Sequence, residues 1–294
     1  MLGPIRAVTT TAADLNAVED AYAKELGYRV VERTVVADAT AAGWGAPAVA
    51  GRKMLVMMPE SGVPTYLRFV EQDLPKGYKP LTTFGWNSTE IVVQNSDALY
   101  ERLKGTAFNI TFAPHDLDGL PDIRAMQGYG PAGEMLYLTW IKRPVAGFDL
   151  PVAKSFVDRC FITVLGGPDM EAMRNFYRDT FGNQSGPVRD TMALVLSDAN
   201  GLPPDWKHPL STLPLGGGSL IEIDQYPTTA TVRPKPSGGL PAGMAIVTFE
   251  YGKLDPLAAR FITQPHPSPI PPFADHRTAT MVGAAGELIE LVEV

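Results

Sequence analysis

The sequence predicts an α+β protein built from four copies of one strand–helix–three-strand module, arranged as two tandem domains. Two internal repeats carry this prediction. The segment "DIRAMQGYGPAGEMLYLTW" (122–140) aligns without a gap with "DHRTATMVGAAGELIELVE" (275–293), and "ADLNAVEDAYAKELGY" (13–28) aligns with "PDMEAMRNFYRDTFGN" (168–183). The two alignments have nearly the same separation along the chain, which is hard to obtain by chance. A tandem duplication is the simplest interpretation.

Each half begins with an apolar run (5–11 and 160–165), followed by an Asp that can cap a helix. The helix has apolar residues at helical spacing, and Gly27 or Gly182 follows where a C-cap is expected. Three strand candidates come next. The last of them, "TYLRFVEQ" and "SLIEIDQY", alternate apolar and polar residues, as in a sheet with one covered face.

The same order of elements recurs within each half. The segments "TEIVVQNSDALYERL" and "MAIVTFEYGKLDPLAARF" each predict a strand leading into a helix, and further strands close the half. We therefore expect two βαβββ modules per domain, with domains at 1–145 and 155–294. The Pro-containing stretch "KRPVAGFDLPVAKSF" joins them.

The composition fits a globular chain with a substantial core, because 45% of the 294 residues are hydrophobic and 19% are charged. The net charge of −7, without a basic run, argues against nucleic acid as a partner. The single cysteine, Cys160, excludes an internal disulfide and fits a reducing compartment. Neither a signal peptide nor a membrane span is indicated, so we expect a cytoplasmic protein without a membrane partner.

Two segments resemble a known family. The helix in "GGPDMEAMRNFYRDTFG" and the closing strand in "GAAGELIELVEV" look like those of the vicinal oxygen chelate superfamily. That superfamily includes glyoxalase I, bleomycin-resistance proteins, methylmalonyl-CoA epimerase and type I extradiol dioxygenases. The resemblance covers nearly the whole chain. It implies two tandem glyoxalase-like domains with open, incomplete β-barrels, in which the concave side, or cup, holds a divalent metal. The metal ligands come from the first and last strands of each module.

In the second domain the resemblance places Glu222 and Glu290 at the last-strand positions, so we expect them to share a cup. The first-strand positions carry no histidine; the candidates there are Ala245 or a neighbour, and Arg159, Cys160 or Ile162. The set of metal ligands is therefore incomplete, and the cofactor stays unknown. Three interpretations of the glutamates remain open: structural hydrogen bonding, a divalent metal site completed by a loop histidine or water, and a metal-free pair of catalytic carboxyls.

In the first domain the equivalent positions carry Arg68, Glu90 and Tyr137, which do not make a metal site. They could make a substrate-binding site in which Arg68 binds a carboxylate, Glu90 acts as a base and Tyr137 donates a proton. The alternative is a salt bridge between Arg68 and Glu90 inside the barrel.

Three further residues are candidates for the second cup. His276 begins the strand that leads to Gly286, so we expect it beside Glu290 as a third catalytic residue. Phe249 could face an apolar or aromatic ligand. Arg277 is a candidate for substrate binding, although Arg124 occupies the same position of the repeat and a shared structural role is equally consistent.

These residues suggest a glyoxalase-like enzyme, a lyase or isomerase acting on a small carbonyl, carboxylate or aromatic compound in the C-terminal cup. Two alternatives stay open. A ring-cleaving extradiol dioxygenase fits the two-domain layout but lacks the pair of histidines that Fe(II) needs. A non-catalytic binding protein that sequesters a small molecule fits the depleted ligand positions. The expected partner is a small-molecule ligand, and the sequence leaves open a homodimer.

Overall fold

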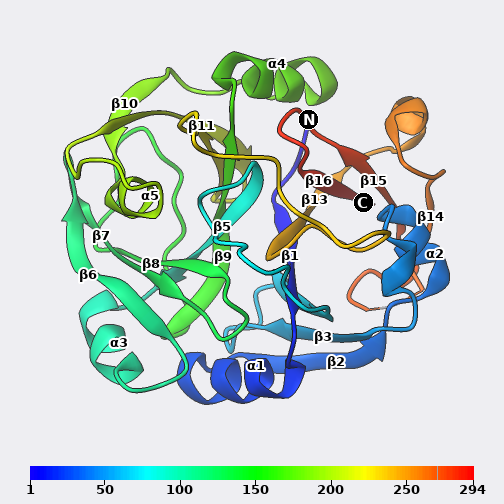
Figure 1. Cartoon of the computed structure of the whole chain (residues 1–294), viewed down its shortest axis with the longest axis horizontal. Coiled ribbons are helices and arrows are strands. Elements are labelled where there is room, and N and C mark those ends of the chain that lie inside the picture. Colours follow the sequence, from blue (N-terminus) through cyan, green and yellow to red (C-terminus); the bar gives the residue numbers. More distant parts are fainter. Residues whose placement is uncertain (270) are drawn as a thin grey trace.

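The computed structural model describes residues 1–269 and 271–294, and its strands form two curled eight-stranded sheets that lie side by side (Figure 1). The terminal sheet contains strands from both ends of the chain, in the order β14 (His266–Pro267), β15 (Arg277–Val282), β16 (Leu288–Glu293), β13 (Met244–Tyr251), β1 (Ile5–Ala12), β4 (Tyr66–Glu71), β3 (Lys53–Met58) and β2 (Arg29–Val35). The central sheet has the order β10 (Arg189–Met192), β11 (Lys207–Gly216), β12 (Ser219–Gln225), β9 (Val157–Gly167), β5 (Gly85–Val93), β8 (Met135–Ile141), β7 (Leu120–Tyr129) and β6 (Asn109–Leu117).

Helices are few and short. They are α1 (Leu15–Ala21), which continues into a π-helical turn (Tyr22–Leu26), α2 (Asp38–Gly43), α3 (Ser96–Leu103), α4 (Met170–Phe181) and α5 (Leu194–Ala199). Two 3₁₀ turns lie at Pro47–Val49 and Asp255–Arg260. The second of these stands where the fourth module was expected to form a helix. Pro265 follows closely and limits how far a helix could extend there. The predicted α+β class with four βαβββ modules is otherwise confirmed.

Modules from different halves of the chain pair with each other. The first strands of modules one and four, β1 and β13, are antiparallel neighbours, and so are β5 and β9 of modules two and three. In Figure 1 the dark blue β1 accordingly lies beside the orange β13, and the cyan β5 beside the green β9. The expectation that the segments 1–145 and 155–294 each form their own cup is therefore wrong. Each half contributes one module to the terminal cup and one to the central cup.

The local signals of the sequence act as predicted. The Asp14 carboxylate accepts hydrogen bonds from the amides of Asn16 and Ala17 at the start of α1, and Asp169 does the same for Ala172 at the start of α4. Gly27 and Gly182 end these helices with φ of 72° and 77°, a left-handed conformation that suits glycine.

Two linkers cross between the sheets, residues 72–84 and 226–243, and they run beside each other. Thr83 and Thr231 form an isolated parallel bridge, and the Gln72 amide exchanges two hydrogen bonds with the backbone of Leu240. Arg233 fastens the pair, because its guanidinium donates to the carbonyls of Thr83, Trp86 and Met244. The two linkers are therefore held against each other between the sheets.

Two buried tyrosine–glutamate hydrogen bonds also join the sheets. Tyr22, in the π-helical turn of module one, donates to Glu134 at the closing turn of module two, over 2.5 Å. Tyr177 of α4 in module three donates to Glu287 of module four, over 3.1 Å. These are the equivalent residues of the two repeats, and each contact crosses from one sheet to the other. Burial raises the pKa of both carboxyls to about 7.

The repeated Gly-x-x-Gly-Glu motif has a physical explanation in these contacts. Gly133 and Gly286 adopt φ of 76° and 80° in the closing turn. A side chain at Gly130 would place its Cβ only 2.1 Å from the carboxylate of Glu134. At Gly283 the distance to Glu287 would be 1.9 Å. The first glycine of each motif thus leaves the space into which the glutamate folds back.

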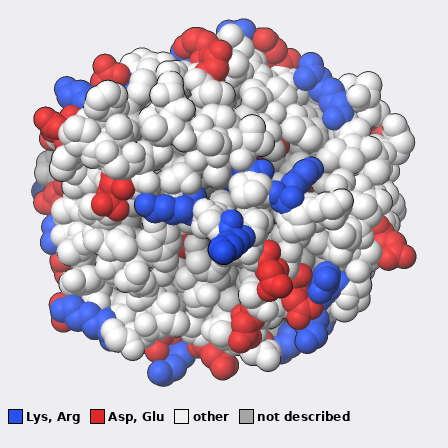
Figure 2. Space-filling model, viewed as in Figure 1, with Lys and Arg blue, Asp and Glu red and all other residues white. Residues whose placement is uncertain are grey.

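On the face drawn in Figure 2, basic and acidic side chains are scattered and separated by wide uncharged areas. Within the described part of the chain, no helix has the length and apolar character needed to cross a membrane.

The junction formed by the two buried Tyr–Glu contacts between the sheets predicts a pH-dependent stability. Glu134 and Glu287 bind protons more tightly in the folded than in the unfolded chain, so the free energy of unfolding should fall as pH rises from 5 to 8. For a pKa raised from 4.5 to about 7, each carboxyl would cost about 3 kcal/mol when fully ionised. Urea denaturation at a series of pH values measures this.

The double variant Glu134→Gln/Glu287→Gln should show a flatter pH profile, since glutamine keeps an acceptor for each tyrosine but cannot ionise. The exposed Glu101→Gln should keep the wild-type slope. A wild-type stability that rises between pH 5 and 8 would contradict this account.

Candidate functional site

The terminal cup is centred on Arg68. The side chains that meet it come from the first and last strands of modules one and four: Thr9 on β1, Thr248 on β13 and Glu290 on β16. The Arg68 Nε atom donates to the Thr9 hydroxyl over 2.8 Å, and Nη2 donates to Thr248 over 2.8 Å and to Glu290 over 2.6 Å. The Thr248 hydroxyl also donates to Glu290, over 2.5 Å.

Aromatic side chains close this cluster. The indole nitrogen of Trp44, which follows α2, donates to the second oxygen of Glu290 over 2.7 Å. The Arg68 guanidinium lies 5.3 Å from the Trp44 ring and 5.6 Å from the Phe273 ring, which is within cation–π range. Arg68 and Glu290 are each 3% exposed. Burial by itself would raise the pKa of Glu290, but Arg68, Thr248 and Trp44 together bring it below its ordinary value.

The terminal cup therefore contains its own cation. The resemblance implies a divalent ion between the first and last strands, and here the Arg68 guanidinium donates hydrogen bonds to side chains of those same strands. Within the described residues, no three His, Cys, Asp or Glu side chains come together in a way that could hold a metal. The side chains of this chain thus do not fit the metal site that the resemblance implies.

The central cup has a different set of residues at the equivalent positions. Glu90 on β5 lies directly beside Tyr137 on β8, and Glu222 on β12 lies beside Val164 on β9. Thr139, two residues beyond Tyr137, donates a 2.6 Å hydrogen bond to Glu90. Glu90 is 6% exposed, and its burial raises the pKa of the carboxyl to about 7, with the Thr139 hydrogen bond acting in the opposite direction.

Asp224 and Tyr226 extend the polar belt that Glu90, Tyr137 and Glu222 form in the central cup. Asp224 is two residues beyond Glu222 on β12 and so faces the same side of the sheet. Burial raises the pKa of both carboxyls, and the charges of Asp224 and Glu90 raise that of Glu222 further. One Asp224 oxygen and the Tyr226 hydroxyl are buried without a hydrogen-bond partner. Burial raises the pKa of Tyr137, and the charges of Glu222 and Asp224 raise it further, so the three groups lie within electrostatic range of one another.

Apolar side chains cover both ends of the central cup. At one end α5 packs with Tyr137 and Tyr226, and α5 lies within the curve of the central sheet (Figure 1). Its Ser197 hydroxyl is 3.0 Å from the Nε2 atom of His208 on β11, whose pKa is lowered by burial. At the other end the 142–156 linker packs Phe148 and its apolar neighbours against the sheet. Glu222 and Tyr137 between these ends remain partly exposed, so water reaches the polar belt.

The structure separates the residues that were expected to share a cup. Glu222 belongs to the central sheet and Glu290 to the terminal sheet, so they do not form one catalytic pair or one metal site. Arg68 pairs with Glu290 rather than with Glu90, which rules out the expected Arg68–Glu90 salt bridge. Glu90 and Tyr137 do lie side by side.

The other three candidates lie outside both cups. His276 is exposed, with Nδ1 2.9 Å from the Glu293 carbonyl oxygen, because it precedes β15 rather than entering the cup. Phe249 is buried between the sheets, with its ring centre 5.9 Å from that of Trp86. On β15 the alternation of side chains turns Thr280 toward Glu290 and Arg277 away from it.

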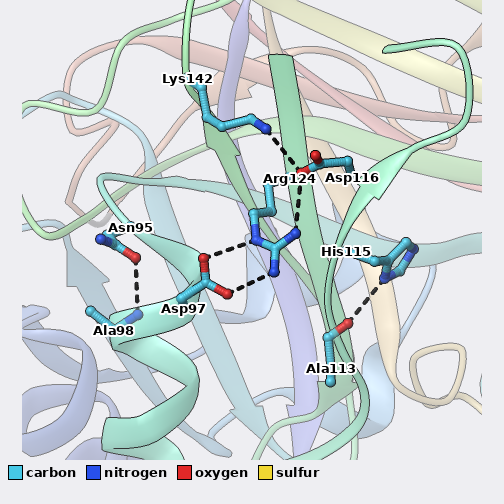
Figure 3. A network of polar contacts seen from close by, with 8 residues as sticks. All are labelled: Asn95, Asp97, Ala98, Ala113, His115, Asp116, Arg124 and Lys142. Atoms are coloured by element: carbon cyan, nitrogen blue, oxygen red, sulfur yellow. Dashed lines mark hydrogen bonds and ion pairs between the residues drawn. The ribbon is translucent and has the colours of Figure 1, made fainter. Parts of the chain in front are cut away.

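Arg277 has the structural role that its repeat position suggested. It forms ion pairs with Asp255, in the 3₁₀ turn of module four, and with Glu293. Figure 3 shows the equivalent network around Arg124, which binds Asp97 at the start of α3 and Asp116 on β6. In both modules the arginine holds the helical segment against the outer face of the sheet.

Four residues of the two cups were not predicted from the sequence: Thr9, Trp44, Thr248 and Asp224. Asp224 could have been found, because "SLIEIDQ" alternates and places it on the face of Glu222. Thr248 was missed because its strand was aligned on Ala245, whereas the register pairs Thr248 with Glu290. Trp44 follows a short helix outside the repeat and gave no signal.

The Arg68 cluster predicts a large and specific loss of stability. Arg68→Met should lower the free energy of unfolding by about 3–5 kcal/mol, because Glu290 would keep a buried charge without a cation. Arg68→Met/Glu290→Met should recover most of that loss. The matched control is Arg33→Met. Arg33 forms an exposed ion pair with Glu19, so its loss should change stability far less. Equal losses for Arg68→Met and Arg33→Met in urea denaturation would disprove this role of Arg68.

No protein-family model matches the chain. No curated protein matches it either. Comparison of structures does find relatives in fold. Glyoxalase I from Zea mays matches with a TM-score of 0.66 at 17% identity, over 99% of this chain and 92% of that one. A putative dioxygenase from Bacillus subtilis matches with a TM-score of 0.62 at 15% identity, over 99% and 85%. The resemblance seen in the sequence is thus confirmed for the fold: this chain has the two-barrel fold of the vicinal oxygen chelate superfamily.

Proposed function

We propose that the chain is an enzyme of the lyase or isomerase type that moves protons on a small organic molecule in the central cup. The observation that carries this proposal is the contrast between the cups. The terminal cup neutralises its carboxylate with Arg68, whereas in the central cup Glu90 and Asp224 are buried, Glu222 is partly exposed, and none of the three forms an ion pair with a described residue. Carboxyls in such surroundings are typical of sites that exchange protons.

Each group has a suitable role. Glu90 has a pKa of about 7, so it exchanges a proton readily at neutral pH and can act as the general base. Burial, with a further contribution from the charges of Asp224 and Glu90, raises the pKa of Glu222, so that this residue can serve as the acid. Tyr137 lies beside Glu90 and can donate a hydrogen bond to an oxygen on which negative charge develops. These roles suit abstraction of a proton next to a carbonyl group.

The two alternative functions have different support. The ring-cleaving dioxygenase is not proposed, because the described residues do not assemble the two histidines and one carboxylate that such a site uses. Sequestration without turnover is supported by the apolar clusters that cover both ends of the central cup. A ligand that binds there and undergoes no proton exchange would favour sequestration.

Proton exchange in deuterated water tests the enzyme proposal. The protein is incubated with a panel of small α-hydroxy-, α-amino- and α-keto-carbonyl compounds, with and without an aromatic ring. Loss of the hydrogen signal next to the carbonyl is followed by NMR. We expect exchange with at least one member of the panel. Glu90→Gln should slow it by about 100-fold or more, which is the usual contribution of a general base.

Glu101→Gln, which removes an exposed carboxyl, should exchange at the wild-type rate. Retained thermal stability of Glu90→Gln separates lost chemistry from lost folding. Absence of exchange across the panel, or exchange that Glu90→Gln leaves unchanged, would disprove the proposal.

A further inference from the structure

The central cup contains acceptors that lack a donor. Glu90, Glu222 and Asp224 bring three carboxyls to one concave face, two of them on β12 and one on β5. Asp224 is 5% exposed and Tyr226 is 4% exposed, yet one oxygen of Asp224 and the Tyr226 hydroxyl have no hydrogen-bond partner. Buried polar atoms are nearly always paired in proteins, and a ligand in the cup would supply the partners that these two atoms lack.

The charged groups around the cup do not supply a cation to these carboxyls. Arg233 lies near enough to Tyr226 to act against the rise of its pKa, but its guanidinium donates to backbone carbonyls and to the Thr83 hydroxyl. On β11, burial lowers the pKa of His208 and so disfavours its charged form. Other titratable groups beside the cup are Tyr137 on β8, Asp198 on α5 and Lys79, whose ammonium donates to the Ala199 carbonyl at the end of α5. Lys79 is exposed, and among the described residues it forms no ion pair with Glu90, Glu222 or Asp224.

The walls of the cup are apolar and aromatic. Tyr129, Phe84 and Phe112 pack around Tyr137 and Tyr226 at the end covered by α5. Large apolar side chains stay exposed at the adjoining segments, namely Met192 at 42%, Leu194 at 39% and Trp206 at 49%. Met192 pairs with Lys207, the neighbour of Trp206, so these side chains lie on adjacent segments beside α5. An apolar body would find contacts both in the cup and at this rim.

We infer that the central cup binds an organic ammonium ion, a positively charged amine carried on an apolar or aromatic body. The ammonium group would donate hydrogen bonds to Asp224 and Glu222, and the tyrosine rings would add cation–π attraction. This inference rests on the proposed function in taking the central cup as the ligand site. It narrows the substrate to an amine-bearing compound and disfavours the free carboxylates that the sequence had left open.

Binding of three matched probes tests the inference. Benzylammonium, benzyl alcohol and benzoate share one aromatic ring and differ in charge. By calorimetry at pH 8, benzylammonium should bind at least tenfold more tightly than benzyl alcohol, and benzoate should bind most weakly. Ammonium binding requires ionised carboxyls, so its affinity should rise from pH 6 to pH 8. A neutral ligand that accepts hydrogen bonds from protonated carboxyls would bind less well over the same range.

Variants give an independent readout. Asp224→Asn should weaken benzylammonium about tenfold and leave benzyl alcohol unchanged, while Asp205→Asn, at an exposed loop position, should alter neither. Equal affinity for the amine and the alcohol, tighter binding of benzoate, or an amine affinity that falls with pH would overturn the inference.

The outcomes separate this inference from the proposed function. Exchange of neutral carbonyl compounds without preference for amines would keep the enzyme proposal and reject the ammonium ligand. Tight ammonium binding without any proton exchange would do the reverse.

Discussion

A carboxyl buried in a protein must be neutralised by a cation or by a proton, and this constraint governs the junction and both cups of the molecule. In the terminal cup Arg68 neutralises Glu290, and two threonines and Trp44 occupy the remaining hydrogen-bonding atoms. At the junction Glu134 and Glu287, which accept hydrogen bonds from Tyr22 and Tyr177, have their pKa raised to about 7 by burial and so are protonated below that pH. The central cup also relies on protons, but it leaves part of its hydrogen-bonding capacity unused. The same constraint is thus met by a built-in cation in the terminal cup and by protons in the central cup.

The exchange of modules between the halves makes the two cups interdependent. Modules one and two follow each other in the chain, yet they lie in different sheets and are held together by the Tyr22–Glu134 hydrogen bond. Modules three and four are held by the Tyr177–Glu287 contact. A change in either half therefore alters both cups.

The sequence predicted the modules well and their partners poorly, for a physical reason. Helix caps, closing glycines and strand alternation are local, so Asp14, Gly27 and the Gly-Glu motif could be recognised from neighbouring residues. Each module, however, offers its first strand as the pairing edge, and four similar edges allow more than one pairing. The observed pairing is accompanied by linker contacts such as that of Gln72 with Leu240, 168 residues apart in sequence, which no local pattern predicts. The expectation that Glu222 and Glu290 meet failed at this step, although both do stand on last strands of their modules.

Divergence between the cups also bears on which of them does chemistry. A carboxyl such as Glu90, which lies against β-sheet and receives one hydrogen bond from Thr139, destabilises the fold whenever it ionises. Replacement by an apolar side chain would remove that cost, as Val164 does at the neighbouring first-strand position. The central cup keeps three carboxyls without a cation, although the terminal cup shows that a single arginine can neutralise a buried glutamate. The fold therefore carries a stability cost that its architecture does not require. Departures of this kind from the most stable arrangement are concentrated at functional sites. We therefore propose the acidic central cup, rather than the terminal cup, as the functional site.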